Sequence, residues 1–311
     1  MQVSVKKHQN STEGKIKEFA HKENTKNDPI QEKEEIRVPE SIFLGIMHVL
    51  AFAGLILLFT YDKQTIIRSL CLMGFLHYLS CLGIGSGVHR LWAHRSYKAS
   101  TPYRVLLMIL QSLAFQGSIF HWSRDHRLHH KFSDTDLDPH SMNRGFFFAH
   151  MGWLLVKKSK ALVDEGYKID VQDLLNDPVV KFQKKNYYKL STLICFIIPT
   201  ILSYFIVGGS LIFGFLTAGV FRYIFMLHVT WCVNSVCHMF GTRPYNPDIL
   251  PTENLFVSIF ACGEGWHNWH HEYPRDWRAC ENKWYKWNPN GWFIQIAELL
   301  GFANTHLEKA Q

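Results

Sequence analysis

Two apolar runs, SIFLGIMHVLAFAGLILLFTY at residues 41–61 and TIIRSLCLMGFLHYLSCLGIGSG at residues 65–87, decide the fold. A helix needs about 20 predominantly apolar residues to cross the hydrocarbon core of a bilayer, and both runs reach that length. Only DKQ separates them, so the chain must turn back at once. The sequence therefore predicts a membrane hairpin made of two helices.

A second pair of apolar runs lies much further along the chain. LSTLICFIIPTILSYFIVGG covers residues 190–209 and LIFGFLTAGVFRYIFMLHVTW covers residues 211–231, again with a very short link. Together the two pairs predict an all-α membrane protein with four transmembrane helices in two hairpins.

A fifth run, RVLLMILQSLAFQGSIF at residues 104–120, is more polar because it contains Gln111 and Gln116. It lies between two clusters of histidines, which a membrane span would put into opposite compartments. We therefore interpret it as a helix along the membrane interface, which leaves both clusters on one side.

These runs divide the chain into a membrane domain at 39–305 and two tails. The N-terminal tail, 1–38, mixes charges of both signs without a hydrophobic period, so we expect it to be disordered. A short tail, 306–311, ends the chain. Within the domain, residues 88–189 and 232–305 are predicted to form a helical cap. The cap and the N-terminal tail hold nearly all the Lys and Arg, so we expect this face and both termini to be cytosolic.

The charge and the cysteines exclude other classes of protein. The net charge of +7 matches the positive bias of loops on the inner face of a membrane. No nucleic-acid recognition motif accompanies the basic residues, so nucleic acid is not an expected partner. The seven cysteines form no CxxC pair, and we interpret them as small buried residues rather than a disulfide framework. A charge is costly inside an apolar run, so Arg222 must serve the cap or extend to the interface.

Histidines are abundant and clustered. Of the eighteen in the chain, eight lie in the short motifs HRLWAH, HRLHH and HNWHH. Residues at i, i+3 and i+4 share one face of a helix, whereas adjacent residues point about 100° apart. A single HxxHH motif can therefore serve two metal ions. The eight are His89, His94, His126, His129, His130, His267, His270 and His271.

The motif NSVCH adds a ninth candidate just after the fourth apolar run. Asn234 and His238 are four residues apart, so they share a helical face, and the asparagine could hold a metal-bound water. His89 and His94 are five apart, about 140° around a helix. We expect this pair either to serve different metals or to straddle the end of a helix.

The clusters predict a two-metal site on one face of the membrane. Imidazole suits iron, zinc, copper and nickel. No cysteine lies among the candidate ligands and few carboxylates are close, unlike the Glu-rich sites of soluble di-iron bundles. Such a nitrogen-rich site beside a membrane suits oxygen chemistry on a lipid chain, and the spacing is also compatible with zinc-dependent hydrolysis.

Four stretches carry a resemblance to a known family: GVHRLWAHRSYKA, WSRDHRLHHKFSDTDLDPHSMNRGFFFAHMGWLLVKK, TWCVNSVCHMFGTRPYN and FACGEGWHNWHHEYPRDWR. Over roughly residues 38–305 the chain resembles the membrane acyl-CoA desaturases of animals, of the stearoyl-CoA type. The resemblance implies four transmembrane helices under a cytosolic cap in the endoplasmic reticulum membrane. It also implies two iron ions, for which zinc can substitute in purified protein. The implied ligands are His89, His94, His126, His129, His130, His238, His267, His270 and His271, with Asn234 acting through water.

The resemblance also implies where the substrate binds. Matching positions fall on Arg124, Asp125, Lys157 and Lys158 for the CoA headgroup, on Thr230 and Trp231 for the wall of an acyl tunnel, and near Met73 and His77 for its end. Side-chain volume at the tunnel end would limit the chain length. For the lysines the alternative is membrane-flanking charge, and for Met73 and His77 it is ordinary packing.

The expected activity is insertion of a double bond into a saturated long-chain acyl-CoA, by default at Δ9 of a chain of sixteen or eighteen carbons. The resemblance implies dioxygen as oxidant. Because the sequence has no HPGG signature of a fused cytochrome b5 domain, electrons are expected from a separate cytochrome b5 and its NADH-dependent reductase. The alternatives are another regioselectivity such as Δ11, or a di-iron membrane lipid hydroxylase. A metal transporter or storage protein is disfavoured because the candidate ligands crowd on one face of the membrane.

Overall fold

The structure, a computed structural model, describes residues 34–306. Most of the predicted disordered tail, 1–38, and of the C-terminal tail, 306–311, lies outside the described residues. Residues 36–306 belong to one compact unit.

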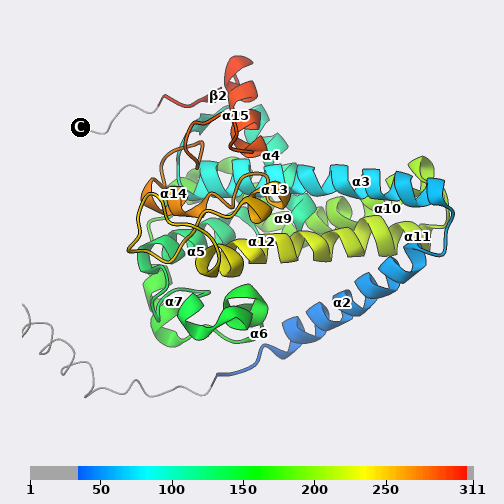
Figure 1. Ribbon diagram of the computed structural model, residues 1–311, viewed down its shortest axis with the longest axis horizontal. Helices are drawn as coiled ribbons and strands as arrows, with labels where there is room; N and C mark the ends of the chain where they lie inside the picture. The colour runs from blue at the N-terminus through cyan, green and yellow to red at the C-terminus, as the bar shows by residue number, and fades with distance from the viewer. Residues whose placement is uncertain (1–33, 307–311) are drawn as a thin grey trace, which may run out of the picture. The chain divides into compact units, whose positions relative to one another are not determined.

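Four helices within residues 34–306 are long and apolar enough to cross a membrane, which confirms the predicted fold class. They comprise α2 (Val38–Leu58); α3 (Lys63–Leu82) with η1 (Gly83–Ala93); α9 (Pro178–Thr192) with η4 (Leu193–Ile197) and α10 (Ile198–Ile206); and α11 (Leu211–Gly214) with η5 (Phe215–Phe221) and α12 (Arg222–Met239). In Figure 1, α3 and α12 run side by side, and the chain turns between α2 and α3 at one end of the bundle, where α10 and α11 also lie.

The cap consists of the residues between the second and third spans, 94–177, and those after the fourth, 240–306. Its helices are α4 (Thr101–Ala114), α5 (Ile119–Phe132), η2 (Met142–Arg144), η3 (Phe148–Gly152), α6 (Trp153–Leu155), α7 (Lys160–Tyr167), α8 (Gln172–Asn176), α13 (Leu255–Phe260), α14 (His267–Glu272) and α15 (Pro289–Leu299). Strands β1 (Lys98–Ala99) and β2 (Ala303–Asn304) pair antiparallel, with Lys98 opposite Asn304. The spans run further than the apolar sequences predicted, because α3–η1 continues to Ala93 and α12 to Met239.

The first hairpin turns where the sequence predicted. The Asp62 side chain begins α3 by accepting hydrogen bonds from the backbone N–H groups of Gln64 and Thr65, at 2.9 and 3.1 Å. A carboxylate in this position satisfies helix-end donors that would otherwise lack partners.

The fifth apolar run breaks in the middle. α4 ends at Phe115, whose φ of 50° takes the chain out of the helix. α5 begins after Ser118, whose hydroxyl accepts from the His121 N–H, and the two helices meet at 82°. Neither helix is long enough to span alone, although the bent pair taken together could count as a broken fifth span.

Arg222 does not extend to the interface, so that expectation is wrong, whereas one of its hydrogen bonds reaches α4 of the cap. It is 1% exposed within the bundle. Its guanidinium donates to the carbonyls of Ala218, Leu113 and Cys195, at 2.9, 3.2 and 2.9 Å, and to the Ser80 hydroxyl at 3.1 Å. Backbone carbonyls compensate the buried charge, and the side chain joins three spans to α4.

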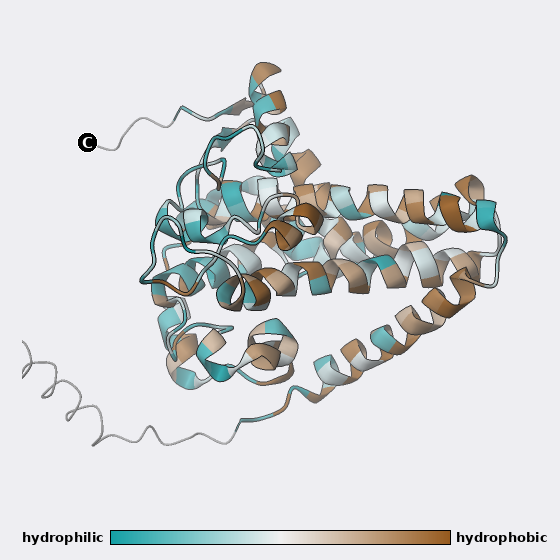
Figure 2. Ribbon diagram, in the orientation of Figure 1, coloured by the Kyte–Doolittle hydropathy of each residue, from teal (hydrophilic) through white to brown (hydrophobic). Residues whose placement is uncertain are grey.

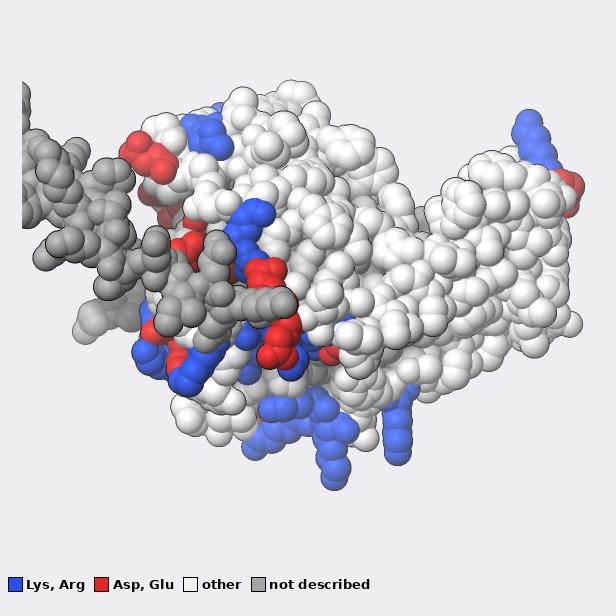
Figure 3. Space-filling model, turned by 90° about the horizontal axis from the view of Figure 1, so that it is seen from below, with Lys and Arg blue, Asp and Glu red and all other residues white. Residues whose placement is uncertain are grey.

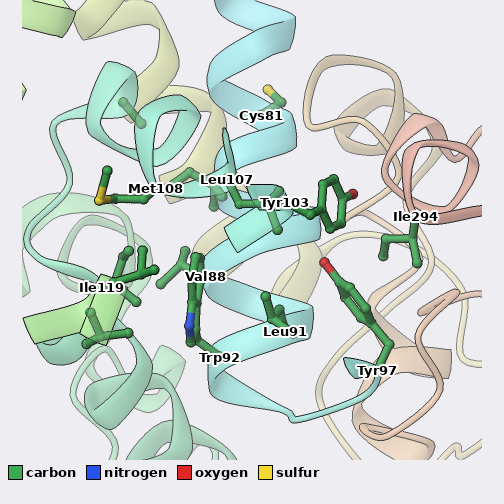
Figure 4. Packing of buried hydrophobic residues seen from close by; sticks show 14 of the residues in the cluster. Cys81, Val88, Leu91, Trp92, Tyr97, Tyr103, Leu107, Met108, Ile119 and Ile294 are labelled. Atoms are coloured by element: carbon green, nitrogen blue, oxygen red, sulfur yellow. The ribbon is translucent and has the colours of Figure 1, made fainter. Parts of the chain in front are cut away.

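The main core cluster fixes η1 against its neighbours. In Figure 4, Val88 and Trp92 of η1 lie on the side of Ile119 in α5, whereas Tyr97 lies on the side of Ile294 in α15. All five side chains are buried. Residues 83–93 are therefore held from α5 on one side and from α15 on the other.

The spans and the cap differ in polarity. Figure 2 shows the spans largely hydrophobic and the cap largely hydrophilic. In Figure 3, charged side chains gather at the cap and at the opposite tip, with few on the broad band between. This distribution is that of a multi-pass membrane protein.

Candidate metal centre

The nine predicted histidines lie together in two adjacent groups. Within each group one nitrogen of every ring lies within 4.8 Å of the others. The first group is His89, His94, His126, His130 and His270; the second is His129, His238, His267 and His271. They come from η1 and its C-terminal end, α5, α12 and α14.

Each HxxHH motif divides between the two groups. In α5, His130 faces the first group and its neighbour His129 faces the second; in α14, His270 and His271 divide in the same way. Adjacent positions on a helix point about 100° apart, which is what allows one short helix to contribute to both groups.

His89 and His94 belong to the same group, so the expectation that they could serve different metals is wrong. His89 lies on η1, a π-helix, and His94 directly follows its last residue, where the N–H of His94 donates to the carbonyl of His89 at 3.0 Å. This i→i+5 hydrogen bond brings residues five apart onto one face. His94 also caps the C-terminal end of η1, as the alternative expectation required.

Carboxylates are closer than the sequence suggested. Glu264 Oε2 lies 2.5 Å from His89 Nδ1, and Asp138 Oδ2 lies 2.9 Å from His129 Nδ1. Asp134 Oδ2 likewise lies 2.9 Å from Nδ1 of His238. The expectation of few nearby carboxylates is therefore wrong, although these carboxylates contact the outer nitrogens rather than the space between the rings.

The histidine tautomers fit metal binding. A carboxylate accepts a hydrogen bond from Nδ1–H and so keeps the proton on that nitrogen, which leaves the lone pair of each paired ring on Nε2. These Nε2 atoms point at Nε2 of unpaired histidines, at 3.1 Å from His238 to His267 and 2.9 Å from His89 to His270. A cation between two such nitrogens can take a lone pair from each. The donor set therefore fits two nitrogen-bound metal ions.

The electrostatics keep most of these rings neutral. Burial lowers the pKa of His126, His130, His267, His270 and His271, and neighbouring histidines lower it further. A neutral imidazole is the form that ligates metal. Burial alone would also lower the pKa of His129, but the Asp138 carboxylate outweighs it and raises that pKa.

A further carboxylate network supports the first group from behind. Glu264 is also bonded to Arg90 at 2.7 Å and to the amide of Asn290 at 2.8 Å. Burial acts to raise the pKa of Glu264, but Arg90 and His89 lower it to about 2. The carboxylate is therefore ionised and fixed in position beside His89.

An apolar cavity opens from the histidines. Four histidines and Asn234 line one part of it, and the rest is lined by Thr230, Cys81, Ile84, Met226, Val229, Val233, Ala261, Trp122 and Glu264. Sequence reasoning missed the apolar members, because an alkyl side chain in an apolar helix gives no signal that distinguishes a cavity wall from core packing.

Of the predicted tunnel residues, Thr230 lines this cavity and three others do not. Trp231 is buried and its ring stacks on His48 with an interplanar angle of 18°. Met73 packs in a separate core cluster. His77 donates a hydrogen bond from Nε2–H to the Phe260 carbonyl at 2.8 Å, because a carbonyl oxygen can only accept.

The predicted headgroup residues cluster at the surface near the start of α5. Asp125 lies between Arg124 and Lys158, with oxygen–nitrogen distances of 2.7 and 2.6 Å. Burial acts to raise the pKa of Asp125, but the two cations lower it. Lys157, which directly precedes Lys158 in the sequence, is exposed.

Comparisons with known proteins agree with this geometry. The family model for fatty acid desaturases matches residues 64–282, more than half of the chain. The chain is 47% identical over 270 residues to "Delta(9)-fatty-acid desaturase fat-6" of Caenorhabditis elegans, covering 86% of this chain and 78% of that protein. It is 47% identical over 265 residues to "Stearoyl-CoA desaturase 5" of Bos taurus, covering 85% and 77%. It is also 47% identical over 263 residues to "Acyl-CoA Delta12-desaturase" of Acheta domesticus, covering 84% and 72%. The chain belongs to the fatty acid desaturase family.

Proposed function

We propose that this protein is an acyl-CoA desaturase that inserts a Δ9 double bond into a saturated chain of sixteen or eighteen carbons. The observation that carries the proposal is the pair of histidine groups opening into an apolar cavity. Relatives named as Δ9 and stearoyl-CoA desaturases support the reaction and the position of the double bond.

The metal ions of the proposal are two irons; each histidine group would hold one, and Asn234 would act through a water bound to one of them. Once bound and reduced, they supply the activation of dioxygen that removing two hydrogens from an alkyl chain requires. The chain's own contribution is to hold nine imidazoles in fixed directions. Asp134, Asp138 and Glu264 do this for three rings by accepting hydrogen bonds from their Nδ1–H groups.

Regioselectivity is a problem of position, because neighbouring methylene groups are chemically alike. An extended chain held at a fixed depth presents one pair of carbons to the metals. Val229, Val233 and Ala261 line the cavity close to the histidines and exclude water from it. The Gln116 amide donates to the Thr230 hydroxyl at 2.9 Å, and this link ties the end of α4 to the cavity wall.

The headgroup anchor of the proposal is the cluster of Arg124, Asp125, Lys157 and Lys158. Basic side chains suit the phosphates of CoA, and an anchored headgroup fixes how far the acyl chain reaches. Met73 and His77 are proposed to limit that reach at the far end. Trp231 is proposed to support the wall through its packing rather than to line it.

The remaining parts of the proposal concern the cellular setting. Electrons come from a separate cytochrome b5 and its NADH-dependent reductase, and dioxygen is the oxidant. The protein lies in the endoplasmic reticulum membrane with the cap and both termini in the cytosol. The concentration of charge at the cap end supports this orientation.

The test is fatty-acid analysis of a desaturase-deficient yeast that expresses this chain, beside His270→Ala and a His306→Ala control. We expect new monounsaturated acids with the wild type and the control and none with His270→Ala. Derivatising the double bond reports its position, and a Δ11 or Δ12 product would overturn the Δ9 assignment. Hydroxylated lipid without unsaturation would favour a hydroxylase, and membrane-inserted, metal-loaded protein without any lipid product would refute both.

A further inference from the structure

Helix α15 presents an exposed apolar face at the side of the cap. Trp292, Ile296, Leu299 and Leu300 are 45%, 54%, 81% and 65% exposed. Their spacing of i, i+4, i+7 and i+8 places them on one face of the helix, and none carries a charge. A contiguous exposed face of this kind marks an interaction surface.

The opposite face of α15 is apolar as well. Ile294 and Ala297 are 0% and 5% exposed and pack in the main core cluster with Tyr103 of α4. Gln295 and Glu298 lie on the side between these two apolar faces. Two opposite apolar faces both need to be covered, and here protein covers only the inner one.

The surroundings of α15 favour lipid. The ring of Phe293 lies 5.6 Å from that of Tyr103, and the Ser100 N–H donates to the Phe302 carbonyl at 2.9 Å, so α15 is joined to the start of α4. The outer face of α4 is also exposed and uncharged at Val105, Leu106 and Ile109. The two outer faces thus belong to neighbouring helices.

The apolar faces of α4 and α15 continue a surface that already faces lipid. Both helices contact α3, whose outer side exposes Ile67, Leu70 and Phe75. Figure 1 shows α15 running across the direction of α3 rather than along it. Because α3 crosses the bilayer, a helix in this direction lies along the plane of the membrane.

Aromatic residues precede α15. Trp284, Tyr285 and Trp287 are exposed, and Lys283 lies beside them with its ammonium 5.8 Å from the Tyr285 ring. Exposed Trp and Tyr next to Lys are typical of the headgroup level of a bilayer.

We propose that α15 is a membrane-plane helix whose outer face is embedded in the lipid of the cap-side leaflet, with residues 284–287 at the headgroup level. The occupant of this surface is therefore the bilayer itself. The proposal does not depend on the substrate or on the metal.

Hydrogen bonds connect α15 to the first histidine group. Asn290 of α15 accepts a hydrogen bond from the Ser86 hydroxyl of η1 at 3.0 Å, and its amide donates to Glu264 at 2.8 Å. Glu264 in turn orients His89. The lipid-embedded helix therefore fixes the depth of the first histidine group relative to the membrane.

The test uses nitroxide labels on the full chain in phosphatidylcholine nanodiscs. Leu299→Cys and, independently, Leu300→Cys are labelled in a Cys71→Ala background, because Cys71 is exposed. Ile67→Cys on α3 serves as the lipid control and Glu272→Cys, at the exposed C-terminal end of α14 in the cap, as the water control. Power-saturation EPR then measures collisions with dissolved oxygen, which prefers lipid, and with a nickel chelate, which stays in water.

We expect the labels at 299 and 300 to behave like that at 67, with frequent oxygen and rare nickel collisions. Nickel collisions as frequent as at 272 would overturn the proposal by placing α15 in water. Rare collisions with both reagents would overturn it differently, because they would show that a protein surface, such as a second copy of the chain, covers the helix. The two label positions guard against a local effect of either substitution.

Discussion

Three carboxylates determine which nitrogen of three histidines faces the metal groups. Asp138 is 2% exposed and accepts from His129 Nδ1 through both oxygens at 2.9 Å. Its oxygens also accept the backbone N–H groups of Asp134 and His140. The carboxylate is thus fixed by the loop after α5 before it fixes the histidine.

Replacing Asp138 by Asn should weaken metal binding by about 10- to 100-fold, the usual cost of losing a partner behind a metal ligand. Metal content after dialysis against a graded chelator series measures the affinity. Asp136→Asn is the matched control, because Asp136 is exposed on the same loop. Equal metal retention by the two variants would contradict the orienting role.

At the scale of the element, η1 decides how the first histidine group forms. Its close packing on α4 depends on Gly83: a Cβ there would lie 2.2 Å from the backbone of Leu110 and of Gln111. Backbone atoms cannot move aside as a flexible side chain can. Residue 83 must therefore be glycine, because only a residue without a side chain fits where η1 crosses α4.

Gly83→Ala should destabilise the protein by about 1–3 kcal/mol through overpacking at the helix crossing. Gly74→Ala in the same span is the control, because a Cβ there meets nothing within 4 Å. Removing a flexible glycine from an exposed helix should stabilise by about 0.5–1 kcal/mol. Melting temperatures in detergent should therefore move in opposite directions, and a shared direction would refute the packing argument.

Arg222 supports a second element-scale prediction. Arg222→Met should cost about 1–3 kcal/mol for each buried acceptor left unpaired, because methionine fills similar space without donating. Arg68→Met, on the exposed side of α3, should change the melting temperature little. If the two variants melted alike, the carbonyl contacts of Arg222 would contribute nothing measurable.

The apolar runs and the HxxHH motifs predicted the four spans and the division of imidazoles between two groups, because both depend only on helical period and length. The bend at Phe115 was missed because phenylalanine gives no signal for a positive φ. The shared group of His89 and His94 was missed because the prediction assumed α-helical geometry, whereas η1 is a π-helix. The role of Glu264 was missed because folding, rather than sequence spacing, brings it to His89.

At the scale of the whole molecule, the metal groups bring together segments that are distant in the sequence. His89 and His270 are 181 positions apart and lie 2.9 Å from each other at Nε2. Bound metal therefore joins the second span, α5, the end of the fourth span and α14. Without metal, buried imidazoles within 4.8 Å of one another must hold the same arrangement with no ion between them.

Chelation should therefore lower the melting temperature, and more so in mild acid. The pKa values of His126, His130, His267, His270 and His271 are lowered in the fold by burial. The neutral rings contribute fully to the free energy of unfolding above the unfolded-state pKa of about 6.5. This contribution is lost as the pH falls below that pKa, because the unfolded chain then binds more protons than the folded one. Melting of chelated protein at pH 7.5, 6.5 and 5.5 measures this. Chelated protein that is equally stable at all three would contradict the burial argument.

The order of the nine histidines along the chain also sets when the centre can be made. A ribosome that has released the first hairpin and η1 has supplied only His89 and His94, and the last four imidazoles emerge after the fourth apolar run. Until then, the early histidines lack the partners that complete both groups. The metal centre can therefore be completed only after all four spans have been synthesised. In a cell short of metal, chains would accumulate that have every span inserted but an incomplete cap, and quality control would have to recognise the cap.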